Sequence, residues 1–495
     1  MNSKLLSNKI TLPLIFTFFA IIYVMISFTN HYLLRTYALD LGMFNHALYS
    51  FSHFKMNYFT LDLTGAEINY FGDHFSPIIM LLAPFSYLFG SYTLLIIQIA
   101  SILIGGYGIF KYASLKFPNT YIPHIITFQF FSIWGIFSAL SYDFHSNVVA
   151  AMLVPWLLYF YETTNKKAFL AIFFLIIICK ENMALWLGFI IIGLVIKRFD
   201  AKQWSKQKTE FLKFELPLIV LSFLYFVIVV AKVMPALSHG QGTNQLARYS
   251  QLGGSVKEII ISMISNPKYI FTLLFESTLN DGISSGIKSE LHFMVLVSGG
   301  FALLFKPHYL IMLAPIYLQK LLTNNFVFWG INFQYSIEFA PILSLCLIDF
   351  LDAKKPIKLV YGIALLIMAT TLHYTIKTID KRVSLWYDNT NTVFYNSKHY
   401  KTQFKHREIK EALKLVPENA IVSTSSVLAP RLAFRDKIYN FPVTKDANYI
   451  VLLTSPGNSY PISEEEFQDK VANFLKDSTY TVKYNLNDLL IVEKK

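Results

Sequence analysis

Long apolar segments alternate with short polar ones along nearly the whole chain, and this pattern constrains the fold most. The first, Thr11–Asn30, is long enough to cross the ~30 Å hydrocarbon core of a bilayer as a helix. Of all residues, 54% are hydrophobic and 16% aromatic, well above the apolar content of a soluble domain. The sequence therefore predicts a polytopic α-helical membrane protein.

The basic residues indicate how the chain is oriented. The net charge is +12, and the bases gather in short clusters between apolar runs. Such clusters are typical of cytoplasmic membrane loops, so we expect no nucleic-acid partner. Lys4 and Lys9 precede the first span, which predicts a cytoplasmic N-terminus in the cell (plasma) membrane.

The segment Phe75–Phe89 decides the topology because it is short and contains Pro77 and Pro84. If it crossed the membrane, the later basic clusters would lie outside, against the positive-inside rule. We therefore expect it to be re-entrant or interfacial, and the C-terminus to lie outside. With Thr11–Asn30, about 11 spans are predicted, the others at 91–112, 121–141, 147–163, 167–181, 183–197, 214–234, 291–305, 308–323, 334–351 and 357–376.

Composition changes after residue 376, which predicts two domains. Residues 1–376 form a multi-span membrane domain with an outer first loop at 31–90, and 377–495 form a small soluble extracytoplasmic α/β domain. Its core is modest, so we expect it to lean on the membrane domain. The expected elements are helices at Arg407–Leu415 and after a capping box at Ser463, strands at Ala420–Ser425 and Tyr449–Thr454, and a hairpin of Tyr480–Leu486 and Leu489–Glu493.

This topology gathers polar groups of chemical value on the outer side. The topology rests on the basic clusters and not on these polar groups, so their convergence on one side indicates where a site lies. They are the loop 31–90, Tyr142–His145, Lys180–Asn182, Pro235–Glu290 and Thr323–Gln334.

Asp40 comes directly before Leu41–Phe51, whose apolar stripe predicts an amphipathic helix along the membrane surface. Its carboxylate suits the N-cap of that helix, the role that the spacing favours. It also suits a general base whose pKa is raised by partial desolvation. The two roles are compatible.

Two Asp-His pairs lie on the same side. Asp73 and His74 could bind a metal or a phosphate, although interfacial polarity is the commoner role of an isolated pair. Asp143 and His145 are two residues apart, so they could share a ligand only in a non-helical turn. The alternative for them is interfacial anchoring.

Lys180 and Glu181 stand between two apolar runs, where charges need partners. Lys180 suits a phosphate, with Glu181 in a supporting contact, and an ion pair between them is the equal alternative. Tyr335 and Glu338, one turn apart in the span 334–351, are expected on one face of a helix. Helix packing is the alternative there.

The order of several motifs is similar to a known family. LDLGMFNHALYS, DHFSPIIMLLAP, YDFHSN, KENMALWLG, QYSIEFAP and the tail ENAIVSTSSVLAPRLAFRDKIYNFP resemble the predicted prokaryotic membrane proteins of domain of unknown function 2079. That family in turn resembles GT-C glycosyltransferases, multi-span enzymes with an acidic residue in the first outer loop. By this resemblance Asp40 matches that acid and Lys180 a later basic position. The chain departs from the commoner pattern in having a single Asp in ALDLG where two acids form a paired motif.

The resemblance implies transfer of a sugar from a polyprenyl-phosphate donor to an acceptor on the outer face, in contact with membrane lipid. Asp40 would deprotonate the acceptor. The implied substrate or phosphate contacts are Arg35, His74, Asp143, His145, Lys180, Glu181 and Tyr335.

The sequence names no cofactor. A divalent metal would have Asp40, Asp73 and His74 as candidate ligands. Two other functions fit the composition: a transporter or lipid flippase with a relay of Lys180, Glu181 and Glu338, and a non-catalytic scaffold that presents the C-terminal domain.

Overall fold

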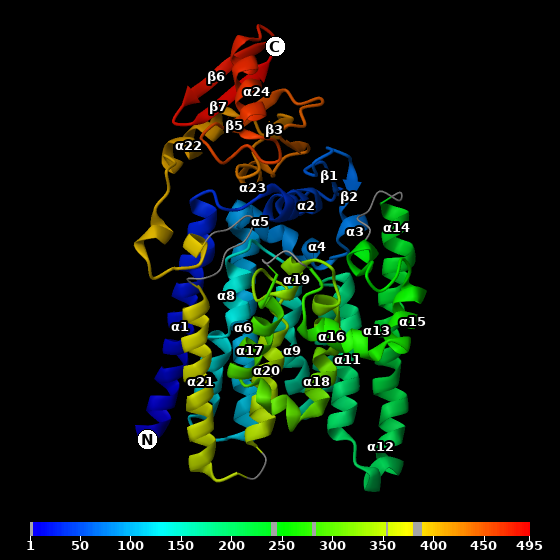
Figure 1. Cartoon of the computed structure of the whole chain (residues 1–495). Coiled ribbons are helices and arrows are strands. Elements are labelled where there is room, and N and C mark those ends of the chain that lie inside the picture. Colours follow the sequence, from blue (N-terminus) through cyan, green and yellow to red (C-terminus); the bar gives the residue numbers. More distant parts are fainter. Residues whose placement is uncertain (1–2, 239–244, 280–283, 353–354, 380–388) are drawn as a thin grey trace.

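The chain folds into a helical bundle with a small sheet domain at one end. A computed structural model describes residues 3–238, 245–279, 284–352, 355–379 and 389–495. The N-terminal end of α1 (Ser3–Tyr32) and the C-terminal domain lie at opposite ends of the bundle (Figure 1). The expected helical class with a small α/β region is therefore present.

The expected spans coincide with helices, but most are shorter than a bilayer requires. By length and composition, four stretches among the described residues suffice: Ile10–Tyr32, Ile78–Lys116, Gln207–Leu237 and Ile357–Ile379. A fifth arises if α7 and α8, bent by 43°, are one span. The count of about 11 remains a prediction. The helices of the bundle after α1 are α6 (Thr93–Lys116), α7 (Ile122–Phe131), α8 (Trp134–Leu140), α9 (Ser146–Glu162), α10 (Lys166–Ile177), α11 (Glu181–Arg198), α12 (Trp204–Glu210), α13 (Leu216–Ile228), α14 (Met234–Leu237), α15 (Val256–Ser265), α16 (Pro267–Phe275), α17 (Ile287–Val297), α18 (Pro307–Leu321), α19 (Phe326–Trp329), α20 (Phe339–Leu351) and α21 (Ile357–Ile379).

The segment Phe75–Phe89 consists of short pieces. These are α4 (Ile78–Leu82), a 3₁₀ turn and α5 (Ser86–Phe89). Gly90, with φ of +51°, follows α5 before the chain enters α6. No piece alone is long enough to cross a bilayer.

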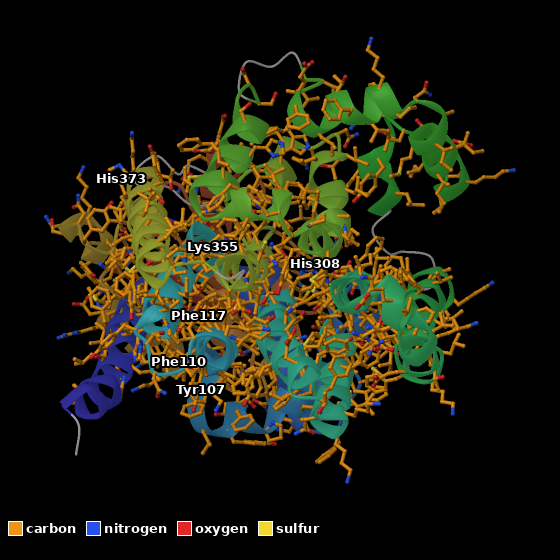
Figure 2. The ribbon with its side chains drawn as sticks, turned by 90° about the horizontal axis from the view of Figure 1, so that it is seen from below. Tyr107, Phe110, Phe117, His308, Lys355 and His373 are labelled. Carbon is orange, nitrogen blue, oxygen red and sulfur yellow. The ribbon has the colours of Figure 1, made fainter. Side chains whose placement is uncertain are left out.

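Helix α6 is central to the bundle and packs against α9 and α7. A Cβ on Gly105 would approach Met152 of α9 to 2.9 Å, so the small residue permits this close packing. Figure 2 looks at the bundle from the end opposite the C-terminal domain. Phe110 of α6 is labelled there, and its ring contacts that of His124 in α7, with centroids 5.1 Å apart.

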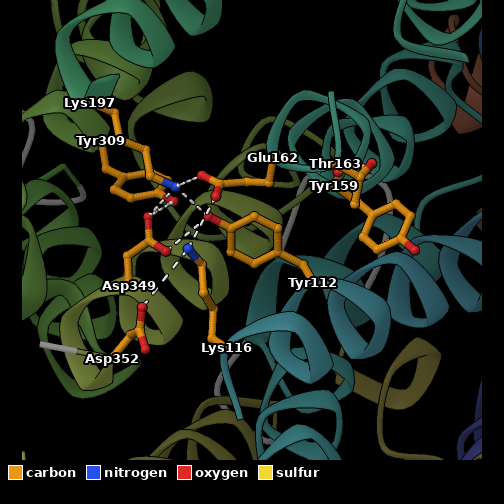
Figure 3. Close-up of polar contacts among 9 residues, drawn as sticks. All are labelled: Tyr112, Lys116, Tyr159, Glu162, Thr163, Lys197, Tyr309, Asp349 and Asp352. Carbon is orange, nitrogen blue, oxygen red and sulfur yellow. Dashed lines mark hydrogen bonds and ion pairs between the residues drawn. The ribbon is translucent and has the colours of Figure 1, made fainter. Parts of the chain in front are cut away.

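Charged side chains meet at this same end, in a group that we call the distal charge cluster (Figure 3). The Lys197 ammonium lies 2.5 Å from Glu162 and 2.7 Å from Asp349. Asp349 also accepts hydrogen bonds from two tyrosine hydroxyls, at 2.8 and 2.7 Å. The cluster joins five helices, and its members are Tyr112, Lys116, Glu162, Lys197, Tyr309, Asp349 and Asp352.

The C-terminal domain holds a mixed sheet of order β4-β3-β5-β7-β6. Strand β3 pairs in parallel with β4 and β5, and β7 pairs antiparallel with β5 and β6. The expected strands, hairpin and helices are confirmed, and Ser463 Oγ accepts the Glu466 N–H at 3.2 Å as the capping box requires. Strand β4 was not expected. The elements are α22 (His406–Ala412), β3 (Val422–Thr424), α23 (Ala429–Leu432), β4 (Ile438–Asn440), β5 (Tyr449–Leu453), α24 (Glu464–Lys476), β6 (Tyr480–Leu486) and β7 (Leu489–Lys494).

This domain rests directly on the first loop, which contains β1 (Tyr58–Phe59), β2 (Ile68–Asn69) and α2 (Met43–Ser52). Thr60 forms a parallel β-bridge with Tyr439, and its hydroxyl donates to the Ile438 carbonyl at 2.6 Å. The apolar stripe of α2 is buried as expected. Its polar side is also covered, so α2 lies inside the molecule instead of open on a membrane surface.

Candidate functional site

Asp40 does not cap a helix, so the expected N-cap role is wrong. It lies within a π-helical turn, Ala38–Gly42, and α2 begins only at Met43 without a side-chain cap. Asp143 supplies the cap from about 100 residues further on. Its Oδ2 accepts the N–H groups of Tyr37 at 3.1 Å and Leu41 at 3.2 Å. The Asp40 carboxylate is therefore left for another role.

That carboxylate faces His145, whose Nε2 lies 3.1 Å from Asp40 Oδ1. Burial by itself raises the pKa of Asp40, but hydrogen bonds from His145 and Tyr142 outweigh it. The net pKa lies below the usual carboxyl value, opposite to the expected direction. Asp40 is therefore ionised near neutral pH.

His145 is held as a neutral ring. Burial lowers its pKa, and the opposing effect of Asp40 does not restore it. A neutral ring that bonds a carboxylate through Nε2 carries its proton there, so His145 donates to Asp40. Its Nδ1 has no hydrogen-bond partner among the residues that the structure describes.

Gln98 of α6 fixes the loop that carries these groups. Its Nε2 donates to the Asp143 carbonyl at 2.8 Å, and its Oε1 accepts the His145 N–H at 3.0 Å. Asp143 has φ of +48°, a backbone conformation that this clamp stabilises. The turn is non-helical, as shared ligation would require. However, Asp143 binds backbone N–H groups while His145 binds Asp40, so both act on the Asp40 turn.

Asp73 and His74 bind each other, with Asp73 Oδ2 2.6 Å from His74 Nδ1, at the end of α3 (Tyr70–Asp73). The His74 ring lies 5.8 Å from that of Phe44 in α2. Within the described ranges, no group of three or more His, Cys, Asp or Glu side chains could hold a metal ion.

Lys180 and Glu181 do not form an ion pair with each other. Glu181, the first residue of α11, accepts the Phe75 N–H at 3.1 Å. Lys180 is half-buried, and none of the carboxylates that the structure describes lies within 4 Å of its ammonium. The charge of Lys180 also lowers the pKa of His145, although less than burial does. Lys180 therefore lies near the Asp40–His145 pair.

Tyr335 and Glu338 do not share a helix face, because α20 begins only at Phe339. Glu338 Oε1 accepts the Asn147 amide at 2.9 Å. Tyr335 lies in the preceding loop, with its ring 4.5 Å from that of Phe328.

An aromatic row leads from this loop to Asp40. Successive ring centroids lie 4.5, 6.2, 4.6 and 5.4 Å apart. The Arg248 guanidinium lies 4.6 Å over the first ring. Among the described residues, no carboxylate lies within 4 Å of the Arg248 guanidinium, as is also the case for Lys180. The row consists of Phe328, Tyr335, Phe333, Tyr142 and His145.

Arg35 binds the segment that leads into the C-terminal domain. Its guanidinium donates to the carbonyls of His399 at 2.9 Å and Lys401 at 2.6 Å. It therefore anchors the segment that enters the C-terminal domain, and we leave it out of the candidate site.

Gln98, Tyr142 and Arg248 belong to this site but were not predicted as site residues. Tyr142 had a signal, since it is adjacent to Asp143 in a polar break between spans. Gln98 lies within an apolar run and Arg248 in a long loop, so nothing local distinguished them.

Comparison with known proteins supports the family suggested by the motifs. No curated protein matches the sequence. The family of predicted membrane proteins with domain of unknown function 2079 (DUF2079) matches residues 30–491, from just before the Asp40 turn to the last strand. Because the match covers nearly the whole chain, this protein belongs to the DUF2079 family of predicted membrane proteins.

Proposed function

We propose that the protein is a membrane glycosyltransferase that moves a sugar from a polyprenyl-phosphate donor to an acceptor on the outer face of the membrane. One observation carries the proposal: at one end of an apolar helical bundle, the carboxylate of Asp40 contacts His145, and Lys180, which has no carboxylate partner among the described residues, lowers the pKa of the same ring through its charge. A base and a phosphate-binding cation at the end of lipid-facing helices suit a donor with a lipid tail and an anionic head.

The transfer follows from these positions. Asp40 takes the proton of the acceptor hydroxyl as its oxygen attacks the anomeric carbon of the sugar. The bond from that carbon to the phosphate oxygen breaks. The oxygen keeps the electron pair, and the lipid-linked phosphate is the leaving group. His145 and Tyr142 hold Asp40 ionised and oriented through their hydrogen bonds.

The leaving phosphate requires positive charge beside it. Lys180 supplies an ammonium without a carboxylate partner in the part of the chain that the structure describes. His74 contributes to the electrostatics of Asp40, and Arg248 presents its guanidinium at the far end of the aromatic row. We propose Lys180 as the principal phosphate contact.

A divalent metal does not fit the donor groups present. Asp73 and His74 bind each other, and Asp40 binds His145, so the three candidate ligands do not converge on one point. We therefore draw no step through a metal.

The direct test incubates the purified protein in lipid vesicles with a panel of radiolabelled polyprenyl-phosphate sugars. Asp40→Asn keeps the size but loses the basic carboxylate, so transfer is expected to fall about 100-fold or more. Asp62→Asn is the matched control, because Asp62 lies in the same loop and its carboxylate, among the residues that the structure describes, bonds only to Thr64.

Full transfer by Asp40→Asn would remove the general-base role. A folded wild type that neither turns over nor binds any carrier would reject the glycosyltransferase. In that case, movement of labelled lipid across the vesicle wall would favour a transporter or flippase, and its absence a scaffold.

A further inference from the structure

The turn that carries Asp40 has backbone N–H groups that its own short helix cannot satisfy. A helical turn leaves its first N–H groups without internal acceptors, and when buried they need other partners. Asp143 of the membrane domain accepts two of them. A third, the Ala38 N–H, is accepted at 3.2 Å by Ser426 Oγ, in a fully buried contact between residues 388 apart in sequence.

Ser426 is itself rigidly placed by the C-terminal sheet. It follows β3 by two residues, and Ser425 before it is bonded to β5 in both directions. The Ser425 N–H donates to the Val451 carbonyl at 3.1 Å, and its hydroxyl accepts the Leu453 N–H at 3.0 Å. A sheet-borne hydroxyl is therefore presented to the Asp40 turn.

The Asp40 turn also packs against the C-terminal domain. A Cβ on Gly42, at the end of the turn, would lie 3.5 Å from the Cβ of Ala429 in α23. Next to it, the Asn45 amide of α2 donates to the Pro430 carbonyl at 3.0 Å. The turn is thus held between the membrane domain on one side and the C-terminal domain on the other (Figure 1).

We propose that Ser426 is a positioning residue for Asp40, so that the C-terminal domain completes the site and does not merely cover it. Ser426 acts through the backbone of the turn and touches no reacting atom. The catalytic part of this inference rests on the proposed function. Its structural part does not, since it concerns how firmly the turn is held.

The chain offers a matched pair of serines for the test. Ser423 lies in β3, is also buried, and its hydroxyl has no hydrogen-bond partner among the residues that the structure describes. Ser426→Ala removes the acceptor of the Ala38 N–H, whereas Ser423→Ala removes a similar volume from the same domain without breaking a bond. Ser426→Thr keeps the hydroxyl and serves as the conservative variant.

Amide hydrogen exchange, read by mass spectrometry on full-length protein in nanodiscs, measures the hold directly. We expect the segment 37–42 to exchange about tenfold faster in Ser426→Ala, a change of the size that one lost hydrogen bond produces. Ser423→Ala and Ser426→Thr should exchange like the wild type. Equal exchange in Ser426→Ala and Ser423→Ala would overturn the proposal, whatever the activity.

The kinetic arm uses the transfer assay described above. Ser426→Ala should lower kcat about tenfold and leave KM for the polyprenyl-phosphate sugar unchanged, because the carrier contacts remain. Ser426→Thr should restore most of kcat. Faster exchange together with unchanged kcat would overturn the positioning role. Faster exchange in a protein whose wild type has no transfer activity would reject the proposed function and uphold the structural hold of Ser426.

Discussion

At the level of single residues, the Asp40–His145 pair is the feature on which the proposed chemistry depends. A neutral imidazole donates to the carboxylate, and the pKa of Asp40 falls below its ordinary value despite burial. A carboxyl with a lowered folded-state pKa stabilises the protein fully above its unfolded value of about 3.9, and that stabilisation is lost as pH falls through the folded value.

This gives a prediction for pH dependence. In His145→Ala the hydrogen bond to Asp40 is lost while burial remains, so the pKa of Asp40 should rise. The acidic limb of kcat/KM against pH should then move to higher pH by about one unit or more. His145→Gln, which retains an N–H donor, should shift it less. An acidic limb that stays in place in His145→Ala would mean that His145 does not control Asp40.

Sequence reasoning identified several of these residues but not their partners. Asp40, His74, His145 and Lys180 were all singled out, and the structure brings them near one another. The N-cap prediction failed because local spacing cannot show that Asp143, from another loop, accepts the N–H groups of the Asp40 turn. The partners of Arg35 could not be predicted for the same reason, since they lie more than 360 residues away.

At the level of elements, the distal charge cluster joins helices that are otherwise held by apolar packing. Lys197 in α11 is its centre, and its side chain is 16% exposed. In an apolar bundle each charge of such a cluster needs the others, because removing one partner leaves the remaining charges buried and uncompensated and so destabilises the protein.

We expect Lys197→Met to destabilise the protein by about 3–5 kcal/mol, since Glu162 and Asp349 lose their shared cation. Lys166→Met, in the exposed pair with Glu210, should cost no more than about 1 kcal/mol. Unfolding in detergent, followed by circular dichroism, would compare the two variants. Equal losses would show that the cluster contributes no more than a surface pair.

Helix existence was predictable and helix boundaries were less so. Apolar runs mark the long bundle helices because burial and lipid exposure both favour apolar side chains, whereas α12, and α15 and α16 within the expected loop Pro235–Glu290, were not predicted. The span 334–351 was predicted to begin five residues before α20 does, because its first residues are equally suited to a packed loop. As a result, Tyr335 and Glu338 were wrongly expected on one face of a helix. Strand β4, which has three residues like β3, was not predicted.

At the level of the whole molecule, the two ends of the bundle differ in character. One bears the distal charge cluster and α12, and the other bears the Asp40 turn and the C-terminal domain (Figure 1). The positive-inside rule predicts that the first end faces the cytoplasm.

Single cysteines can test this orientation. Lys476→Cys, on exposed α24, should react with a membrane-impermeant maleimide in intact cells, and Lys202→Cys, at the distal end, only after permeabilisation. The unsubstituted protein gives the background, because Cys179 and Cys346 are both buried. The reverse pattern of labelling would invert the topology and place the site in the cytoplasm.

The hydrogen bond between Ala38 and Ser426 also has a consequence for biosynthesis. Its partners are separated by 388 residues, and ribosomes add about 5–20 residues per second. Roughly 20–80 s therefore pass between synthesis of the Asp40 turn and synthesis of the hydroxyl that holds it. Until Ser426 has been synthesised, a nascent chain lacks the hydroxyl that holds the Asp40 turn.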